Sequence, residues 1–216
     1  MAKPEKIRQL TVDEYLQLER TSKMRHEYVR GQIFAMSGAT QAHNAICGNL
    51  YAALHNFLRK TGCRVYQSDM KVRIEAADSF YYPDIMVTCE PFDPESVLTR
   101  LPSLIIEVLS PSTKHIDRRE KLVAYRQLSS LRQYILVHQQ RILIEVFSRA
   151  SDIEWELTML RESDKISLEV LPDKPLITPV SAVYEEIVLP PYVKEPEEEY
   201  ELSAAKISGN RAIPRI

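Results

Sequence analysis

The sequence lacks any long hydrophobic run. No segment of its 216 residues approaches the roughly 18 consecutive apolar residues that a membrane-spanning helix requires. The first ten residues, MAKPEKIRQL, also lack the apolar stretch of a secretory signal peptide. We therefore expect a soluble, cytoplasmic protein that makes no membrane contact.

Cysteine is also scarce. The three cysteines are Cys47, Cys63 and Cys89, which lie far apart and do not have the spacing of a zinc site. An odd number without a recognisable framework is typical of proteins kept in a reducing compartment. The sequence predicts that all three are free thiols.

The chain has no strong excess of either charge. Lysine and arginine total 28 and aspartate and glutamate total 30, which gives a net charge of -2. Bulk charge therefore does not argue for nucleic acid as a partner, although a local basic patch or a bound metal ion could supply positive charge. With 44% hydrophobic residues, the length suits one globular domain with a sizeable core.

Alternation and helical spacing predict a mixed α/β (α+β) fold, with a central sheet flanked by helices and extra antiparallel strands. Helices are expected at 11–20, where Thr11 and Glu14 form a capping box, and at 40–62, 113–128 and 181–188. Strands are expected in a hairpin at 25–37, at 64–74, 81–89 and 103–110, and in an antiparallel run at 132–139, 141–149, 153–162 and 165–171. The domain is expected to span 1–188. The Pro- and Glu-rich segment 189–216 is predicted to be a tail that is mobile or ordered by a partner.

A carboxylate interrupts the apolar strand predicted at 103–110. Alternation places Glu107 on the same face as Ile105 and Leu109. An ionised glutamate among aliphatic side chains costs several kcal/mol unless a cation, a metal or a raised pKa offsets the cost. Glu107 is either a salt-bridged structural residue near a sheet edge or part of a functional site, and we favour the site.

A second acid begins the neighbouring strand. Asp84 follows Pro83 directly and precedes an apolar run, which is an unusual place for aspartate. It could simply be a turn or cap residue. Two converging carboxylates would repel each other, and a divalent cation with hard oxygen ligands would remove that repulsion.

The helix after Glu107 supplies basic residues. Asp117, Lys121 and Tyr125 are four residues apart and share one helix face, as either an exposed Asp–Lys pair or part of the site. The same helix carries a basic stretch that is the best candidate for contact with nucleic-acid phosphates, namely Lys114, His115, Arg118, Arg119 and Lys121.

Taken together, the segments Pro83–Asp84, EVLSPST (107–113) and DRREKLVAY (117–125) resemble the Uma2-type family of bacterial restriction-endonuclease-like proteins, within the PD-(D/E)XK nuclease superfamily. The resemblance covers roughly residues 8–190. It implies a restriction-endonuclease-like core and two metal ligands, Asp84 and Glu107. It further implies an additional acid, Glu27, from the hairpin, and a nearby histidine, His43, from the long helix. Glu27 could equally be an ordinary exposed charge of the hairpin, and His43 a hydrogen-bonded helix histidine.

One position departs from the superfamily pattern. Leu109 stands two residues after Glu107, where the superfamily normally has its lysine. The Uma2-type pattern implies that Lys121 replaces that lysine, with Asp117 and Tyr125 positioning it.

The resulting hypothesis is a metal-dependent endonuclease that hydrolyses DNA with Mg²⁺ or Mn²⁺ and acts as a homodimer. The alternative is a catalytically inactive module that binds DNA or oligomerises, which the leucine at position 109 favours. A hydrolase acting through Ser110 or Ser112 is poorly supported, because no glycines flank them as in a nucleophile elbow.

Overall fold

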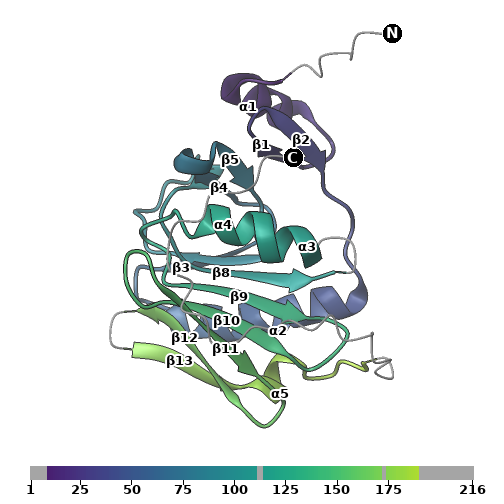
Figure 1. Cartoon of the computed structure of the whole chain (residues 1–216), viewed down its shortest axis with the longest axis vertical. Helices are drawn as coiled ribbons and strands as arrows, with labels where there is room; N and C mark the ends of the chain where they lie inside the picture. Colours follow the sequence, from purple (N-terminus) through teal and green to yellow (C-terminus); the bar gives the residue numbers. More distant parts are fainter. Residues whose placement is uncertain (1–8, 111–113, 172–173, 190–216) are drawn as a thin grey trace.

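A six-stranded mixed sheet forms the centre of the computed structural model, which describes residues 9–110, 114–171 and 174–189. In spatial order its strands are β11 (Trp155–Leu160), β10 (Ile144–Arg149), β9 (Gln133–His138), β8 (Pro102–Leu109), β6 (Ile85–Thr88) and β3 (Arg64–Gln67). The central pair β8–β9 is parallel and the other pairs are antiparallel. The predicted mixed sheet flanked by helices is confirmed (Figure 1).

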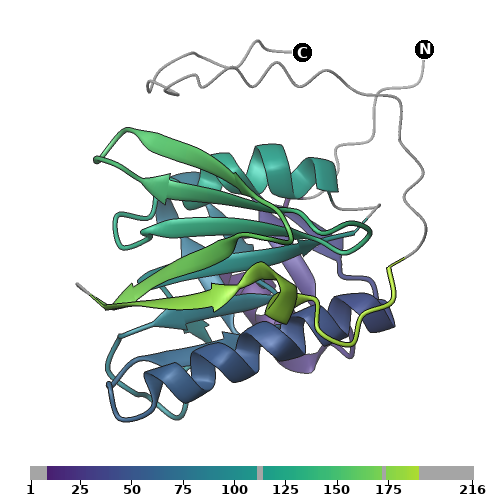
Figure 2. The same cartoon turned by 90° about the horizontal axis from the view of Figure 1, so that it is seen from below.

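Both faces of this sheet are covered. Leu104, Ile106 and Val108 of β8 face a core shared with α2 (Gln41–Leu58), as the alternation predicted. Ile105 and Leu109 face the opposite core, which is covered by α4 (Leu122–Tyr125). Figure 2 shows the two helices on opposite sides of the sheet. Glu107 points to the α4 side, so the apolar pattern of one strand decides which layer receives the acid.

A second, five-stranded sheet supports the N-terminal part of the chain. Its order is β2 (Gln32–Ala35), β1 (His26–Val29), β5 (Ser79–Tyr81), β4 (Lys71–Ile74) and β7 (Leu98–Thr99), with the 3-10 turn η1 (Glu75–Ala77) between β4 and β5. Helix α1 (Val12–Thr21) packs on it through a small aromatic core of Tyr15, Tyr28 and Phe80. The predicted capping box at the start of α1 is present, and so is the predicted hairpin.

The chain crosses between the two sheets several times, and two of these crossings, from β3 to β4 and from β5 to β6, correct the predicted strands. Residues 64–74 form two strands, β3 and β4, because Ser68 adopts a left-handed φ of 56° that turns the chain out of the first sheet. Pro83 separates β5 from β6 within the predicted strand 81–89. The backbone N–H of Ser68 donates to the carbonyls of Pro83 and Asp84, which ties the crossings together and places Asp84 at a junction of the sheets.

The C-terminal elements differ from the prediction in part. Strand β11 continues the antiparallel run, but β12 (Lys165–Leu171) leaves it and pairs with β13 (Lys174–Pro179) in a separate two-stranded sheet. The helix expected at 181–188 is the short α5 (Val180–Val183). Apart from Leu189, the predicted tail 189–216 lies outside the described residues, so its behaviour stays a prediction.

The prediction of three free thiols is wrong. Cys63 and Cys89 form a disulfide, and only Cys47 is free. Strands β3 and β6 pair with Arg64 opposite Thr88, so the next residue outward on each strand is a cysteine and the two side chains meet. This pairing removes the cysteine argument for a cytoplasmic location, which stays a prediction. No helix in the described part of the chain has the length and apolar character to cross a bilayer.

Candidate active site

Asp84 and Glu107 meet where the two sheets join. The backbone N–H of Asp84 donates to Glu107 Oε2 over 3.3 Å. In return, Asp84 Oδ2 accepts the backbone N–H of Val108 over 2.7 Å. The antiparallel pairing of Ile85 with Ile106 sets this register, so the start of β6 lies beside the middle of β8. The structure therefore brings together the two acids that the sequence singled out.

Lys121 lies at the centre of a group of carboxylates. Its Nζ is 2.9 Å from Glu27 Oε1, 3.2 Å from Glu107 Oε1 and 3.2 Å from Asp117 Oδ1. Asp117 and Lys121 are only 2% and 6% exposed, so the alternative of a solvated surface pair is wrong. Burial alone would lower the pKa of Lys121, but the surrounding carboxylates outweigh burial and raise it well above its ordinary value. Lys121 is thus a fixed cation at neutral pH.

A π-helical turn positions Lys121 and Tyr125. Residues Asp117–Lys121 form this turn (η2) between α3 (Lys114–Ile116) and α4. The Tyr134 hydroxyl donates to the Asp117 carbonyl over 3.0 Å, and the Tyr125 hydroxyl donates to Glu107 Oε1 over 3.1 Å. Such turns often mark functional sites. Here, Lys121 and Tyr125 hold one oxygen of Glu107 and leave Oε2 on the side of Asp84.

The environment of Glu107 resists its ionisation. Burial raises the pKa of Glu107 well above its ordinary range, and the charges of Asp84, Asp117 and Glu27 add to this increase while Lys121 opposes it. Glu107 forms a salt bridge with Lys121, which agrees with one part of the hypothesis that it is a structural residue near a sheet edge. However, it lies on a central strand and not at a sheet edge, and it lines an open cleft.

His43, from the first turn of α2, lines the site, and the buried Cys47 lies one turn further along the helix. His43 Nε2 is 3.1 Å from Asp84 Oδ2, and its Nδ1 is 3.7 Å from the Cys47 thiol. Donor atoms of His43, Cys47 and Asp84 all lie within 4.8 Å of one another. Burial raises the pKa of Cys47, and the charges of Asp84 and Glu107 add to this, so the thiol is held protonated. Sequence reasoning missed Cys47, although its position four residues after His43 was a visible signal.

The acids open into a cleft of about 540 Å³. It is bounded by the β1–β2 hairpin, the start of α2 and the crossings from β3 to β4 and from β5 to β6. Arg25, at its mouth, binds Asp69 Oδ1 over 2.6 Å and is a second cation of the cleft that sequence reasoning did not identify. The cleft gives the carboxylates access to solvent and to a substrate.

The predicted basic stretch is not uniformly available for phosphate contact. Arg118 forms an ion pair with buried Glu145 and approaches His138 Nε2 at 2.9 Å. Arg119 is exposed and Lys114 is partly exposed. A contact between Arg118 and nucleic acid would therefore require it to leave an internal partner, whereas Arg119 requires no such change. The phosphate contacts stay predictions.

The donor set suits a hard divalent cation. Glu27, Glu107 and Asp117 surround the single ammonium group of Lys121, and Asp84 lies beside Glu107, so acidic groups outnumber this cation. A divalent ion would offset this excess, and carboxylate oxygens are the ligands that Mg²⁺ and Mn²⁺ prefer.

Two cyanobacterial proteins are similar over most of the chain. The protein slr1290 of Synechocystis sp. is 35% identical over 161 residues, which covers 74% of this chain and 85% of the relative. The protein sll1609 of the same organism is 34% identical over 154 residues, which covers 70% of this chain and 87% of the relative.

A solved structure has the same fold. It is the crystal structure described as a putative nuclease belonging to DUF820 from Anabaena variabilis, with a TM-score of 0.66 at 15% sequence identity, and it covers 81% of this chain and 97% of that one. The model of the Uma2 family, described as "Putative restriction endonuclease", matches residues 12–177. The fold and the acids around Lys121 are consistent with this match. The chain belongs to the Uma2 family.

Proposed function

We propose that this protein is a metal-dependent endonuclease that hydrolyses phosphodiester bonds of DNA. The observation that carries the proposal is the buried lysine held by three carboxylates beside Asp84 in an open cleft. Such a concentration of acids is costly to a fold, and it suits a site that binds a divalent cation.

Asp84 and Glu107 would hold Mg²⁺ or Mn²⁺, through oxygens on the cleft side. When bound, the ion would polarise the phosphoryl oxygen and lower the pKa of an attacking water. Glu107 is prepared for this role because Lys121 and Tyr125 fix its Oε1 and so orient the whole carboxylate. Glu27 and Asp117 keep Lys121 protonated and in place.

Lys121 supplies positive charge and not a base. Its raised pKa leaves it protonated at neutral pH, so it would stabilise the negative charge that grows on the phosphate oxygens. His43 is held by Asp84 and would restrict the orientation of that carboxylate. Arg25 lies at the mouth of the cleft and offers a contact for a phosphate further along the strand.

The test is nicking of supercoiled plasmid DNA with Mg²⁺ or Mn²⁺. We expect Asp84→Asn and Glu107→Gln to lose at least about 100-fold in rate, and EDTA to stop the wild-type reaction. Glu162→Gln, on an exposed turn, makes the same charge change away from the cleft and is expected to keep full activity. Equal nicking by the wild type and both site variants would mean that a contaminant cleaves the DNA.

An inactive module that binds DNA or oligomerises is the second candidate. It is favoured by Leu109, which is buried where the superfamily has its lysine, and by the engagement of Lys121 with three acids. Binding of duplex DNA without cleavage under every metal condition, unchanged in Lys121→Ala, would select it. Sedimentation of the purified chain would test the expected homodimer.

A further inference from the structure

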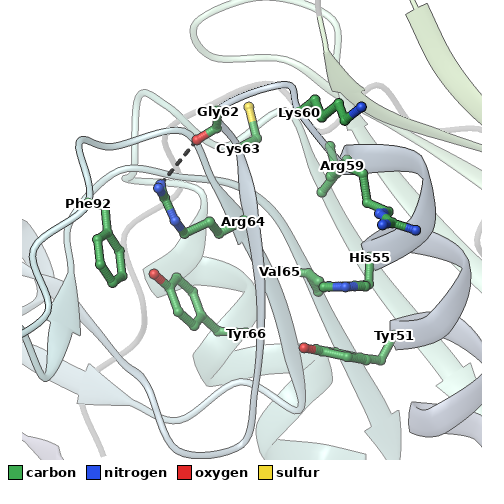
Figure 3. Close-up of a pocket in the computed structure, with 11 residues that line it drawn as sticks. Tyr51, His55, Arg59, Lys60, Gly62, Cys63, Arg64, Val65, Tyr66 and Phe92 are labelled. Atoms are coloured by element: carbon green, nitrogen blue, oxygen red, sulfur yellow. Dashed lines mark hydrogen bonds between the residues drawn. The ribbon is translucent and has the colours of Figure 1, made fainter.

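A second cleft lies at the far end of β3 from the acid site. Its volume is about 480 Å³, and it follows the free edge of β3 between the C-terminal turns of α2 and the segment that carries Phe92. Figure 3 shows side chains that line it, with Arg64 and Tyr66 on one side of the strand and Tyr51 and His55 of α2 on the other. We call it the edge cleft. No residue of the acid site lines it.

The edge cleft is cationic. Arg59, Lys60 and Arg64 line it, together with His55, and none of its lining residues is acidic. Within the described ranges, Arg59, Lys60 and Arg64 form no ion pair with a carboxylate. The helix dipole accounts for a cation at the end of α2, such as Arg59, but not for Arg64 on the neighbouring strand. In a chain with a net charge of -2, this is a local excess of positive charge that suits an anion.

Aromatic rings accompany these cations. The ring of Phe92 is 60% exposed, and the Arg64 guanidinium lies over it at 4.5 Å from the ring centre. On the other side of β3, Tyr51 and His55 are stacked, with ring centres 5.7 Å apart and planes 12° apart. The disulfide between Cys63 and Cys89 fixes the segment before Phe92 to the start of β3. Flat rings that are held in place beside arginine and lysine suit a ligand with both a phosphate and a planar base.

The position of the edge cleft relative to the acids is also informative. Arg64 lines the edge cleft and Ser68 lines the acid site, and β3 joins them. Four residues of strand span roughly 13 Å, a distance that a few nucleotides cover, since successive nucleotides of a stacked strand rise by about 3.4 Å. A single strand could therefore occupy both clefts.

We propose that the edge cleft binds a nucleotide, with Arg59, Lys60 and Arg64 contacting the phosphate and Phe92 stacking on the base. The nucleotide belongs either to a nucleic-acid strand that continues from the acid site or to a free nucleotide. Binding does not depend on the proposed hydrolysis, so it is measured in EDTA, where cleavage requiring a metal does not occur.

The experiment measures fluorescence anisotropy of a 5′-fluorescein-labelled dT12 oligonucleotide, with thymidine 5′-monophosphate as competitor. We expect Phe92→Ala to weaken oligonucleotide binding about tenfold, because stacking of one base is worth roughly 1–3 kcal/mol. Arg59→Gln/Lys60→Gln should also weaken binding and reduce the slope of log affinity against log salt by up to about 0.7, the value for one neutralised phosphate of a single strand.

Matched controls separate the edge cleft from general charge and from the acid site. Arg161→Gln/Lys165→Gln removes the same charge elsewhere on the surface, and Ile177→Ala truncates a side chain that is also 60% exposed. Both are expected to bind like the wild type. Because binding is measured in EDTA without cleavage, a failed nuclease assay would leave this result standing. Thermal unfolding of each variant checks that it is folded.

Competition by the mononucleotide identifies the source of the ligand. Competition that is lost in Phe92→Ala assigns the edge cleft to a free nucleotide, whereas a Phe92-dependent signal seen only with the oligonucleotide assigns it to a strand. Equal binding by the wild type and both cleft variants, or an equal loss in the controls, overturns the proposal.

Discussion

Replacing Lys121 with methionine tests the electrostatic account of the site directly. The substitution removes the ammonium group from within 3.2 Å of Glu27, Glu107 and Asp117 while keeping much of the side-chain volume. Breaking a buried ion pair by removing one partner typically costs about 3–5 kcal/mol. For a domain of this size, a loss of 1 kcal/mol lowers the melting temperature by roughly 2–4 °C, so we expect a decrease of about 6–20 °C without metal at pH 8.

The loss of stability caused by Lys121→Met should depend on pH in a defined direction. Lys121 opposes the increase in the pKa of Glu107, so its loss raises that pKa further. A carboxyl whose pKa is raised in the folded state binds its proton more tightly there than in the unfolded chain. Its contribution to stability is therefore complete below the unfolded value of about 4.3 and is lost as pH rises through the folded value. We expect Lys121→Met to be destabilised less at pH 5 than at pH 8.

Urea unfolding can be followed by the fluorescence of Trp155, the only tryptophan, which is 3% exposed in the core beside α4. Lys165→Met, at an exposed position of β12, is the control and should change stability by no more than about 0.5 kcal/mol. A cost below about 1 kcal/mol at pH 8, or a cost that grows towards pH 5, would refute the reasoning.

Three further predictions concern the same elements. Metal affinity, measured by calorimetry, should rise up to about tenfold per pH unit until the raised pKa of Glu107 is passed, because the ion must displace a proton, and Glu107→Gln should abolish this dependence. Tyr125→Phe should lower the free energy of unfolding by about 1–3 kcal/mol in urea titrations, since Glu107 Oε1 loses a buried donor, and an unchanged midpoint would contradict this. Cys63→Ser/Cys89→Ser should cost about 3.5 kcal/mol by loop-closure entropy over the 26-residue separation, and a reducing agent should affect the wild type but not this variant.

The acids could be identified from the sequence because each one breaks a strong local pattern. Glu107 interrupts an apolar strand, and Asp84 stands between a proline and the apolar run of the next strand. Both acids therefore stand out before any contact is known. The spacing of Asp117, Lys121 and Tyr125 indicated a shared face, and the structure brings all three towards Glu107. What the pattern could not reveal was the π-helical turn, because backbone hydrogen bonding leaves no mark on residue type.

Other features depended on long-range register. The break at Ser68 could not be predicted, because the alternation of apolar residues continues through residues 64–74. A serine with positive φ also lacks a sequence signature comparable to that of glycine. Cys63 and Cys89 are paired only because β3 lies antiparallel to β6 in one particular register. Strand β13 contains two prolines, Pro175 and Pro179, and was therefore not predicted, although proline is tolerated in a strand at a sheet edge.

The π-helical turn at Asp117–Lys121 makes this site sensitive to chain length. An ordinary α-helix advances about 100° per residue. Deleting one residue from the turn would give a more regular helix. It would also rotate Tyr125 by roughly 100° about the helix axis, and so turn its hydroxyl away from Glu107. A helix with better backbone hydrogen bonding would then have a poorer arrangement of side chains, so selection for the arrangement would oppose such a deletion.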